Sequence, residues 1–169
     1  MKHLSRRSVL AATLVLSATL VIVHFAQDAA DRARATATLL TAARAGDRIR
    51  VLNALDNGAH PDIVDSGGQS PLMMAAARGD VEIARSLLDA GAGISGRDAH
   101  GNTVLMLASA SGNATLVELL IFWRSDVNAR RTDGASALSI ARKSTGAATS
   151  QQNQKQEVIR ILLRAGAHE

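Results

Sequence analysis

The stretch that decides the fold is residues 65–92, DSGGQSPLMMAAARGDVEIARSLLDAGA, because much of it is repeated further along the chain. Glycines recur every 33 residues, at Gly68, Gly101 and Gly134. Three more columns keep this period, and their members are Ser70, Thr103 and Ser136; Leu72, Leu105 and Leu138; and Ala75, Ala108 and Ala141. A fixed period of this length is typical of proteins that stack one small structural unit many times.

Each unit carries the start and stop signals of two short helices. Ser70 can cap the first helix by accepting a hydrogen bond from a free backbone N–H group, and Pro71 suits the first helical position. Gly79 can end that helix in the left-handed conformation. Apolar residues then recur at helical spacing over residues 81–88, and residues 94–102 contain the glycines of an extended turn. The sequence therefore predicts a unit of finger, helix, turn and second helix.

These units resemble the ankyrin repeat. The T-P-L-H-x-A-A core of that family is matched by residues 70–76 (SPLMMAA), 103–109 (TVLMLAS) and 136–141 (SALSIA), with the histidine replaced. The closing G-A-x-x-N segment is matched in part by residues 91–92, 126–128 and 166–167. The resemblance implies an all-α solenoid of stacked helix-turn-helix units with β-turn fingers. It also implies a protein that binds other proteins without catalysis.

The repeat domain is predicted to span residues 38–169. It divides into a capping first repeat at 38–64, two repeats at 65–97 and 98–130, and a last repeat at 131–169. From Leu87 to Leu162 is 75 residues, against 66 for two periods, so nine residues are added to the last repeat. They lie within residues 143–156, whose polar composition predicts a surface loop or a helix extension. Residues 27–37 predict an Ala-rich helical linker that can continue into the first repeat.

Residues 1–26 have the composition of an export signal or a signal anchor. Lys2, Arg6 and Arg7 precede an uncharged run at residues 9–23 that is rich in Leu, Val and Ala. Arg6 and Arg7 also resemble a twin-arginine signal. His24-Phe25-Ala26 is a poor cleavage site, so an uncleaved helix that contacts the membrane through residues 9–26 is favoured. The expected location of the repeats is the periplasm, tethered to the inner membrane if the signal stays uncleaved.

Composition argues against several other functions. The chain has no cysteine, so disulfides and thiolate metal sites are excluded. Its net charge of +4 is concentrated in residues 1–35, which leaves the repeats nearly neutral and without the footprint of a nucleic-acid-binding domain. The five histidines show no spacing typical of a metal site, and no nucleophile motif is present. We expect no enzyme activity, no cofactor and no bound metal.

The resemblance assigns a partner-binding row to finger tips and first helices. The residues that face the partner would be Arg44 in the first repeat; Ser66, Gly67, Gln69, Ala77 and Arg78 in the second; Ala99, His100, Asn102, Ala110 and Ser111 in the third; and Thr132, Asp133, Ala135 and Lys143 in the last. Phe122 and Trp123 are two of the three aromatic residues. They would be natural interface anchors, although packing against the nine-residue insertion is the favoured interpretation.

Resemblance to bacterial periplasmic ankyrin proteins suggests what the partner could be. One role is support of an exported oxidative-defence enzyme such as catalase. Another is an immunity protein that neutralises a delivered toxin. A third is a membrane-anchored structural spacer, in which the N-terminal segment mediates assembly. In each case the repeat domain is expected to be monomeric.

Overall fold

The structure is a computed structural model that describes the backbone of residues 6–143 and 149–168, with side chains from 22 to 143 and from 152 to 168. These residues form α1 (Arg6–Ala45), α2 (Arg48–Asp56), α3 (Pro71–Arg78), α4 (Val81–Asp89), α5 (Val104–Ser111), α6 (Ala114–Phe122), α7 (Ala137–Lys143) and α8 (Thr149–Arg164). The described residues contain no strand, and two isolated antiparallel bridges, Arg97 with Thr103 and Arg130 with Ser136, close two of the fingers. The prediction of an all-α repeat fold is confirmed.

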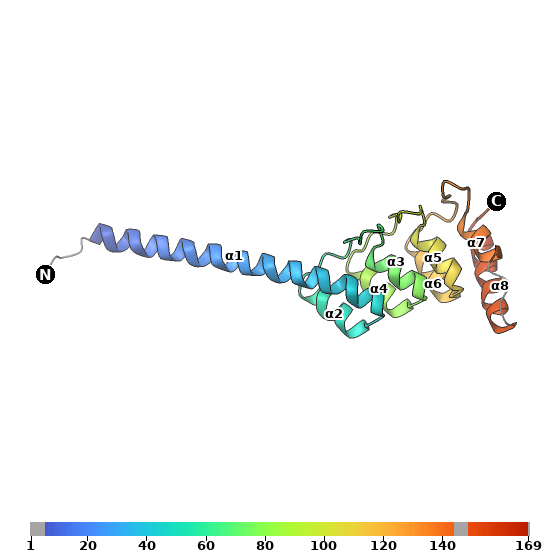
Figure 1. The fold of residues 1–169 in the computed structure, drawn as a ribbon, viewed down its shortest axis with the longest axis horizontal. Helices are drawn as coiled ribbons and strands as arrows, with labels where there is room; N and C mark the ends of the chain where they lie inside the picture. Colours follow the sequence, from blue (N-terminus) through green and yellow to red (C-terminus); the bar gives the residue numbers. More distant parts are fainter. Residues whose placement is uncertain (1–5, 144–148, 169) are drawn as a thin grey trace.

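The helices stack as four antiparallel pairs, each made of a first and a second helix (Figure 1). The first helices α1, α3, α5 and α7 contact one another in order, and the second helices α2, α4, α6 and α8 form a parallel row. The connecting fingers lie along one edge of the stack (Figure 1). Because each pair contacts only its neighbours, the stack remains open rather than closing around one centre.

Capping side chains begin the helices at the 33-residue period. Ser70 and Thr103 cap α3 and α5, and each hydroxyl accepts a backbone N–H three residues later. Asp47, Asp80 and Asn113 do the same for α2, α4 and α6. These bonds satisfy N–H groups that the helix itself leaves free. The start of each short helix is therefore fixed locally.

The core consists of thin layers between successive pairs. Leu72, Leu105 and Leu138 are at most 1% exposed, and the alanines of the same repeats at 75, 108 and 141 are fully buried. Burying one leucine contributes about 1.5–3 kcal/mol. Alanine beside leucine lets neighbouring first helices approach closely, which explains how a chain with 2% aromatic residues can fill its core.

The linker and the first helix of the first repeat form one continuous helix. The backbone of α1 is helical from Arg6 to Ala45, so residues 27–37 are its middle part. Leu39, Ala42 and Ala43 are buried against the stack, whereas the first half of α1 extends far beyond it (Figure 1). Within the described residues, no helix combines the length and the apolar character needed to cross a membrane. Most of the apolar run at residues 9–23 lies outside the described side chains, so the signal or anchor stays a prediction.

The insertion in the last repeat lengthens its second helix. α8 has 16 residues, against nine in α4 and in α6, and it begins at Thr149. A Cβ built on Gly112 would lie 3.5 Å from Cγ of Lys155, which places this extension beside the start of α6. Of the two predicted forms, the described part of the insertion adopts the helix extension.

The third repeat ends differently from the other three. Gly58, Gly91 and Gly166 follow the second helices of the other repeats with φ between 77° and 88°, whereas Arg124 occupies this position with a φ of 67°. The next residue, Ser125, stands where the others have a buried alanine, and its Oγ is buried without a hydrogen-bond partner. Both departures destabilise the repeat, because a left-handed arginine is strained and an unpaired buried hydroxyl loses its bond to water.

Candidate functional site

Two finger tips are held by an aspartate at their base. Asp65 Oδ1 accepts the backbone N–H of Gly67 at 2.8 Å and of Gln69 at 2.9 Å. Asp98 Oδ1 accepts the N–H of His100 at 2.9 Å and of Asn102 at 2.8 Å. The fingers are therefore formed before any partner arrives, and little loop ordering is lost on binding.

The last finger uses a different residue for the same purpose. Arg131 stands in the column of Asp65 and Asp98, and Asp133 instead accepts the N–H of Ala135 at 3.0 Å. The guanidinium of Arg131 also binds both carboxylate oxygens of Asp133, with Nε 3.0 Å from Oδ1. The substitution thus moves the turn-closing carboxylate two residues along the finger.

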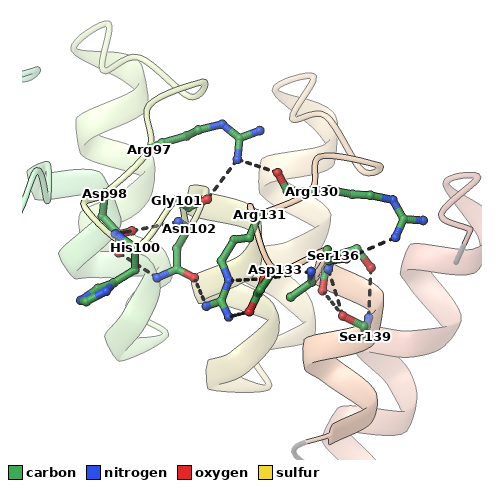
Figure 2. A network of polar contacts seen from close by, with 12 residues as sticks. Arg97, Asp98, His100, Gly101, Asn102, Arg130, Arg131, Asp133, Ser136 and Ser139 are labelled. Atoms are coloured by element: carbon green, nitrogen blue, oxygen red, sulfur yellow. Dashed lines mark hydrogen bonds and ion pairs between the residues drawn. The ribbon is translucent and has the colours of Figure 1, made fainter.

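A continuous chain of polar contacts joins the fingers of the third and fourth repeats (Figure 2). Asn102 Nδ2 donates to Asp98 Oδ2 at 2.9 Å, and Arg131 Nη1 donates to Asn102 Oδ1 at 2.9 Å. From Arg131 the chain continues to Asp133. Neighbouring fingers are therefore braced against each other by side chains as well as by helix packing.

These contacts favour the charged form of the finger carboxylates. The hydrogen bond from Arg131, with the N–H of Ala135, holds the pKa of Asp133 far below its ordinary value. The N–H of Gln69 is the main cause of the lowered pKa of Asp65. Burial alone would raise the pKa of Asp98, but its hydrogen bonds with Asn102 and His100 lower it. All three fingers are thus built on ionised aspartates at neutral pH.

Arg97 and Arg130 brace the opposite side of the fingers from His100 and Asp133 (Figure 2). Arg97 Nη1 donates to the carbonyl oxygens of Gly101 and Arg130, both at 3.0 Å. Arg130 Nη1 donates to Gly134 O at 3.2 Å. Arg97 and Arg130 are absent from the predicted partner-binding row, although their spacing of 33 residues is visible in the sequence.

The predicted partner-binding residues occupy two connected regions. On the first helices Arg44, Ala77, Arg78, Ala110 and Lys143 are exposed and Ser111 is half-buried. On the fingers Ser66, Ala99, His100, Thr132 and Asp133 are exposed, while Gly67, Gln69, Asn102 and Ala135 are half-buried. We call the exposed side chains on the first helices, from Arg44 to Lys143, the first-helix face.

Several of these predicted residues also serve the stack itself. Gly67 O accepts the N–H of Ala99 at 2.8 Å, which ties two fingers together. Arg44 Nη2 lies 2.6 Å from Asp65 Oδ2, joining α1 to the finger of the second repeat. A substitution at such a position would change the scaffold as well as any docking surface. Ala77 and Ala110, which make no side-chain hydrogen bond, are cleaner positions for testing partner binding.

The structure describes only part of the insertion, so the interpretation that Phe122 and Trp123 pack against it stays a prediction. The described part of the insertion lies beside the start of α6, whereas these aromatics lie at its end. The side chain of Phe122 is 79% exposed and that of Trp123 is 38% exposed. They remain available as interface anchors.

A hollow of about 220 Å³ lies between the loops of the second and third repeats, and its lining includes Ser95, Ser125 and Asp126. In the same column as Ser95, Asp62 Oδ1 accepts the N–H of Gly93 at 2.6 Å. Its other counterpart, Asn128, accepts the N–H of His168 at 3.0 Å. Among the described residues the side chain of Ser95 makes no such inter-repeat bond, and the hollow lies beside it.

Histidine and acidic side chains are dispersed over the described part of the chain. Where side chains are described, no three His, Asp or Glu residues come together as metal ligands. The charged groups of the fingers are consumed by turns and by contacts between neighbouring fingers. The arrangement is suited to presenting a surface.

Comparison with known proteins agrees with this architecture. A family model described as ankyrin repeats, in three copies, matches residues 39–133, which is more than half of the chain. No curated protein sequence matches the chain. Ankyrin repeats are protein–protein interaction modules, and the matched stretch covers the first three helix pairs and reaches the last finger. By its repeats and by its fold, this chain belongs to the ankyrin-repeat family.

Proposed function

We propose that this chain is an exported, non-catalytic docking protein that binds a partner protein through the first-helix face and the adjacent finger tips. The observation that carries the proposal is that this face is exposed and already formed. Its helices are fixed by packing, and the fingers beside it by their own aspartates. A preformed surface loses little conformational entropy when a partner docks.

Site-specific crosslinking tests where the partner docks. A photoreactive amino acid replaces Ala77 or Ala110 on the first helices, and Arg85 on the exposed side of α4 is the matched control position. The full chain is produced in its native cells and irradiated, and adducts are identified by mass spectrometry. We expect one partner to be captured from positions 77 and 110 and not from position 85. Equal capture from all three positions, or none, would contradict the proposal.

The proposed location is the periplasm, with the chain tethered to the inner membrane through residues 9–26. Support comes from the basic residues Arg6 and Arg7 ahead of a long apolar run. Protease treatment of spheroplasts tests on which side of the inner membrane the repeats lie. The mass of the mature N-terminus tests whether the signal is cleaved. Repeats protected from the protease would exclude export.

The identity of the captured partner separates the proposed roles. A haem enzyme of oxidative defence such as catalase supports the first role, and a toxin whose activity the chain blocks supports an immunity function. Deleting residues 1–35 tests the spacer, because a docking module keeps its partner without them and an assembly element does not. The favoured role is support of a partner enzyme, since an exposed, non-enclosing face can bind an enzyme without blocking its active site.

A further inference from the structure

The fold sorts charges that are interspersed in the sequence. In the first helices, counting residues 38–45 of α1 with α3, α5 and α7, the charged residues are Arg44, Arg78, Arg142 and Lys143, and none is acidic. The second helices carry both signs, among them Glu82, Asp89, Glu118, Arg48, Arg85, Arg160 and Arg164. The nearly neutral repeat domain therefore has one face on which only positive side chains occur.

The neighbouring finger carboxylates neutralise only part of this charge. Asp65 pairs with Arg44, Asp133 pairs with Arg131, and Asp98 is 6% exposed inside its own turn. Within the described residues, no carboxylate lies within ion-pair distance of Arg78 or Lys143. These two charges are consequently unbalanced by the protein.

Arg78 is held in place without an acidic partner. A Cβ built on Gly46 would lie 2.5 Å from Nη2 of Arg78, so the guanidinium rests on the glycine that ends the first helix of the preceding repeat. On its other side Arg78 borders a hollow of about 390 Å³ that also includes Ser111, Asn113, Thr115 and Gln154. The lining of this hollow contains one positive charge and no negative one. Its composition is suited to accepting carboxylates.

We propose that the first-helix face receives an acidic segment of the partner protein, with Arg78, Arg142 and Lys143 supplying the complementary charge. The inference rests on the proposed docking function and names the chemistry of the partner. Charge complementarity of this kind speeds encounter and selects among partners. Basic residues near helix C-termini also stabilise their own helices. A purely stabilising role would leave peptide binding unaffected, and the two roles can be separated by experiment.

The test uses the purified full chain in an uncharged detergent and a fluorescent decaglutamate peptide, with binding followed by anisotropy. We expect saturable binding that weakens as salt is raised, because exposed charges are screened. The variant Arg78→Gln/Arg142→Gln/Lys143→Gln should bind about tenfold more weakly, since each exposed charge pair contributes roughly a two- to fivefold change. The control, Arg85→Gln/Arg160→Gln/Arg164→Gln, removes the same charge from the second helices and should bind nearly as the parent does.

Three results would overturn the inference. The first is a lack of decaglutamate binding, and the second is equal weakening in both triple variants. The third is tighter binding of a DNA duplex than of decaglutamate through the same three residues, which would make the face a general polyanion site. Circular dichroism of each variant shows whether the fold is retained. If the peptide fails to bind while crosslinking from Ala77 still captures a partner, the docking function is retained and the inference that the partner segment is acidic is rejected.

Discussion

Replacing Arg124 with glycine should stabilise the third repeat. Arg124 has a φ of 67°, in the region where the other three repeats have glycine. The left-handed conformation lowers the free energy of unfolding by about 1–2 kcal/mol when the residue has a side chain. Glycine avoids this strain, but it loses more backbone entropy on folding, which offsets about 0.5–1 kcal/mol of the gain. The guanidinium makes no hydrogen bond or ion pair among the described side chains, so none is lost. The expected net gain is about 0.5–1 kcal/mol.

Urea unfolding of the full chain measures this gain. Circular dichroism reports the helices, and the fluorescence of Trp123, the one tryptophan, reports the environment beside the substitution. We expect a higher midpoint at an unchanged slope, since the surface buried on folding hardly changes. Gly91→Ala is the reciprocal control. A Cβ at Gly91 would meet no atom within 4 Å, so a loss of stability there would come from backbone strain alone. A lower midpoint for Arg124→Gly would refute the strain argument.

Three further predictions concern the same junctions. Ser125→Ala should raise the free energy of unfolding by about 1 kcal/mol, because it removes a buried unpaired hydroxyl at a position where the other repeats have alanine; a decrease in urea unfolding would mean that the hydroxyl has a partner. Ser95→Asn should raise the free energy of unfolding by a similar amount, because the asparagine amide can donate or accept a hydrogen bond at the loop that includes Asp126. Faster hydrogen exchange in that loop would contradict this prediction. Asp133→Asn should reduce the dependence of the free energy of unfolding on pH at acidic pH. Its carboxylate, whose pKa is lowered by Arg131, stabilises the fold above the unfolded value of about 4, and this contribution is lost as the pH falls; an unchanged profile would exclude the contribution.

Most of the fold could be predicted because its determinants are local and periodic. Ser70 and Gly79 state where a helix begins and ends, and the 33-residue spacing places each unit beside the next. Arg124 stands in the column of Gly91 when the repeats are aligned, and it is there that the structure has a non-glycine residue with a positive φ. The continuity of α1 with the first repeat also followed from composition, since residues 27–37 contain no helix breaker.

The remainder depended on contacts between units, which a sequence period does not describe. The insertion could form a loop or a helix, and only its packing beside Gly112 shows that it lengthens α8 away from Phe122. Arg97 and Arg130 repeat at the period, yet the backbone carbonyls that they bind are visible only in the folded fingers. The segregation of charge was hidden because acidic residues of the second helices alternate in sequence with basic residues of the first.

The unbroken backbone of α1 has a mechanical consequence. About 26 residues of this helix precede Arg32, whose side chain lies beside Gly58 of the first repeat, and this length corresponds to a rod of roughly 40 Å. A helix resists twisting as well as bending. Whatever binds the first turns of α1 therefore also fixes the distance and the orientation of the first-helix face. Lengthening the rod by two alanines would swing this face by about 200° around the helix axis and leave every repeat unchanged.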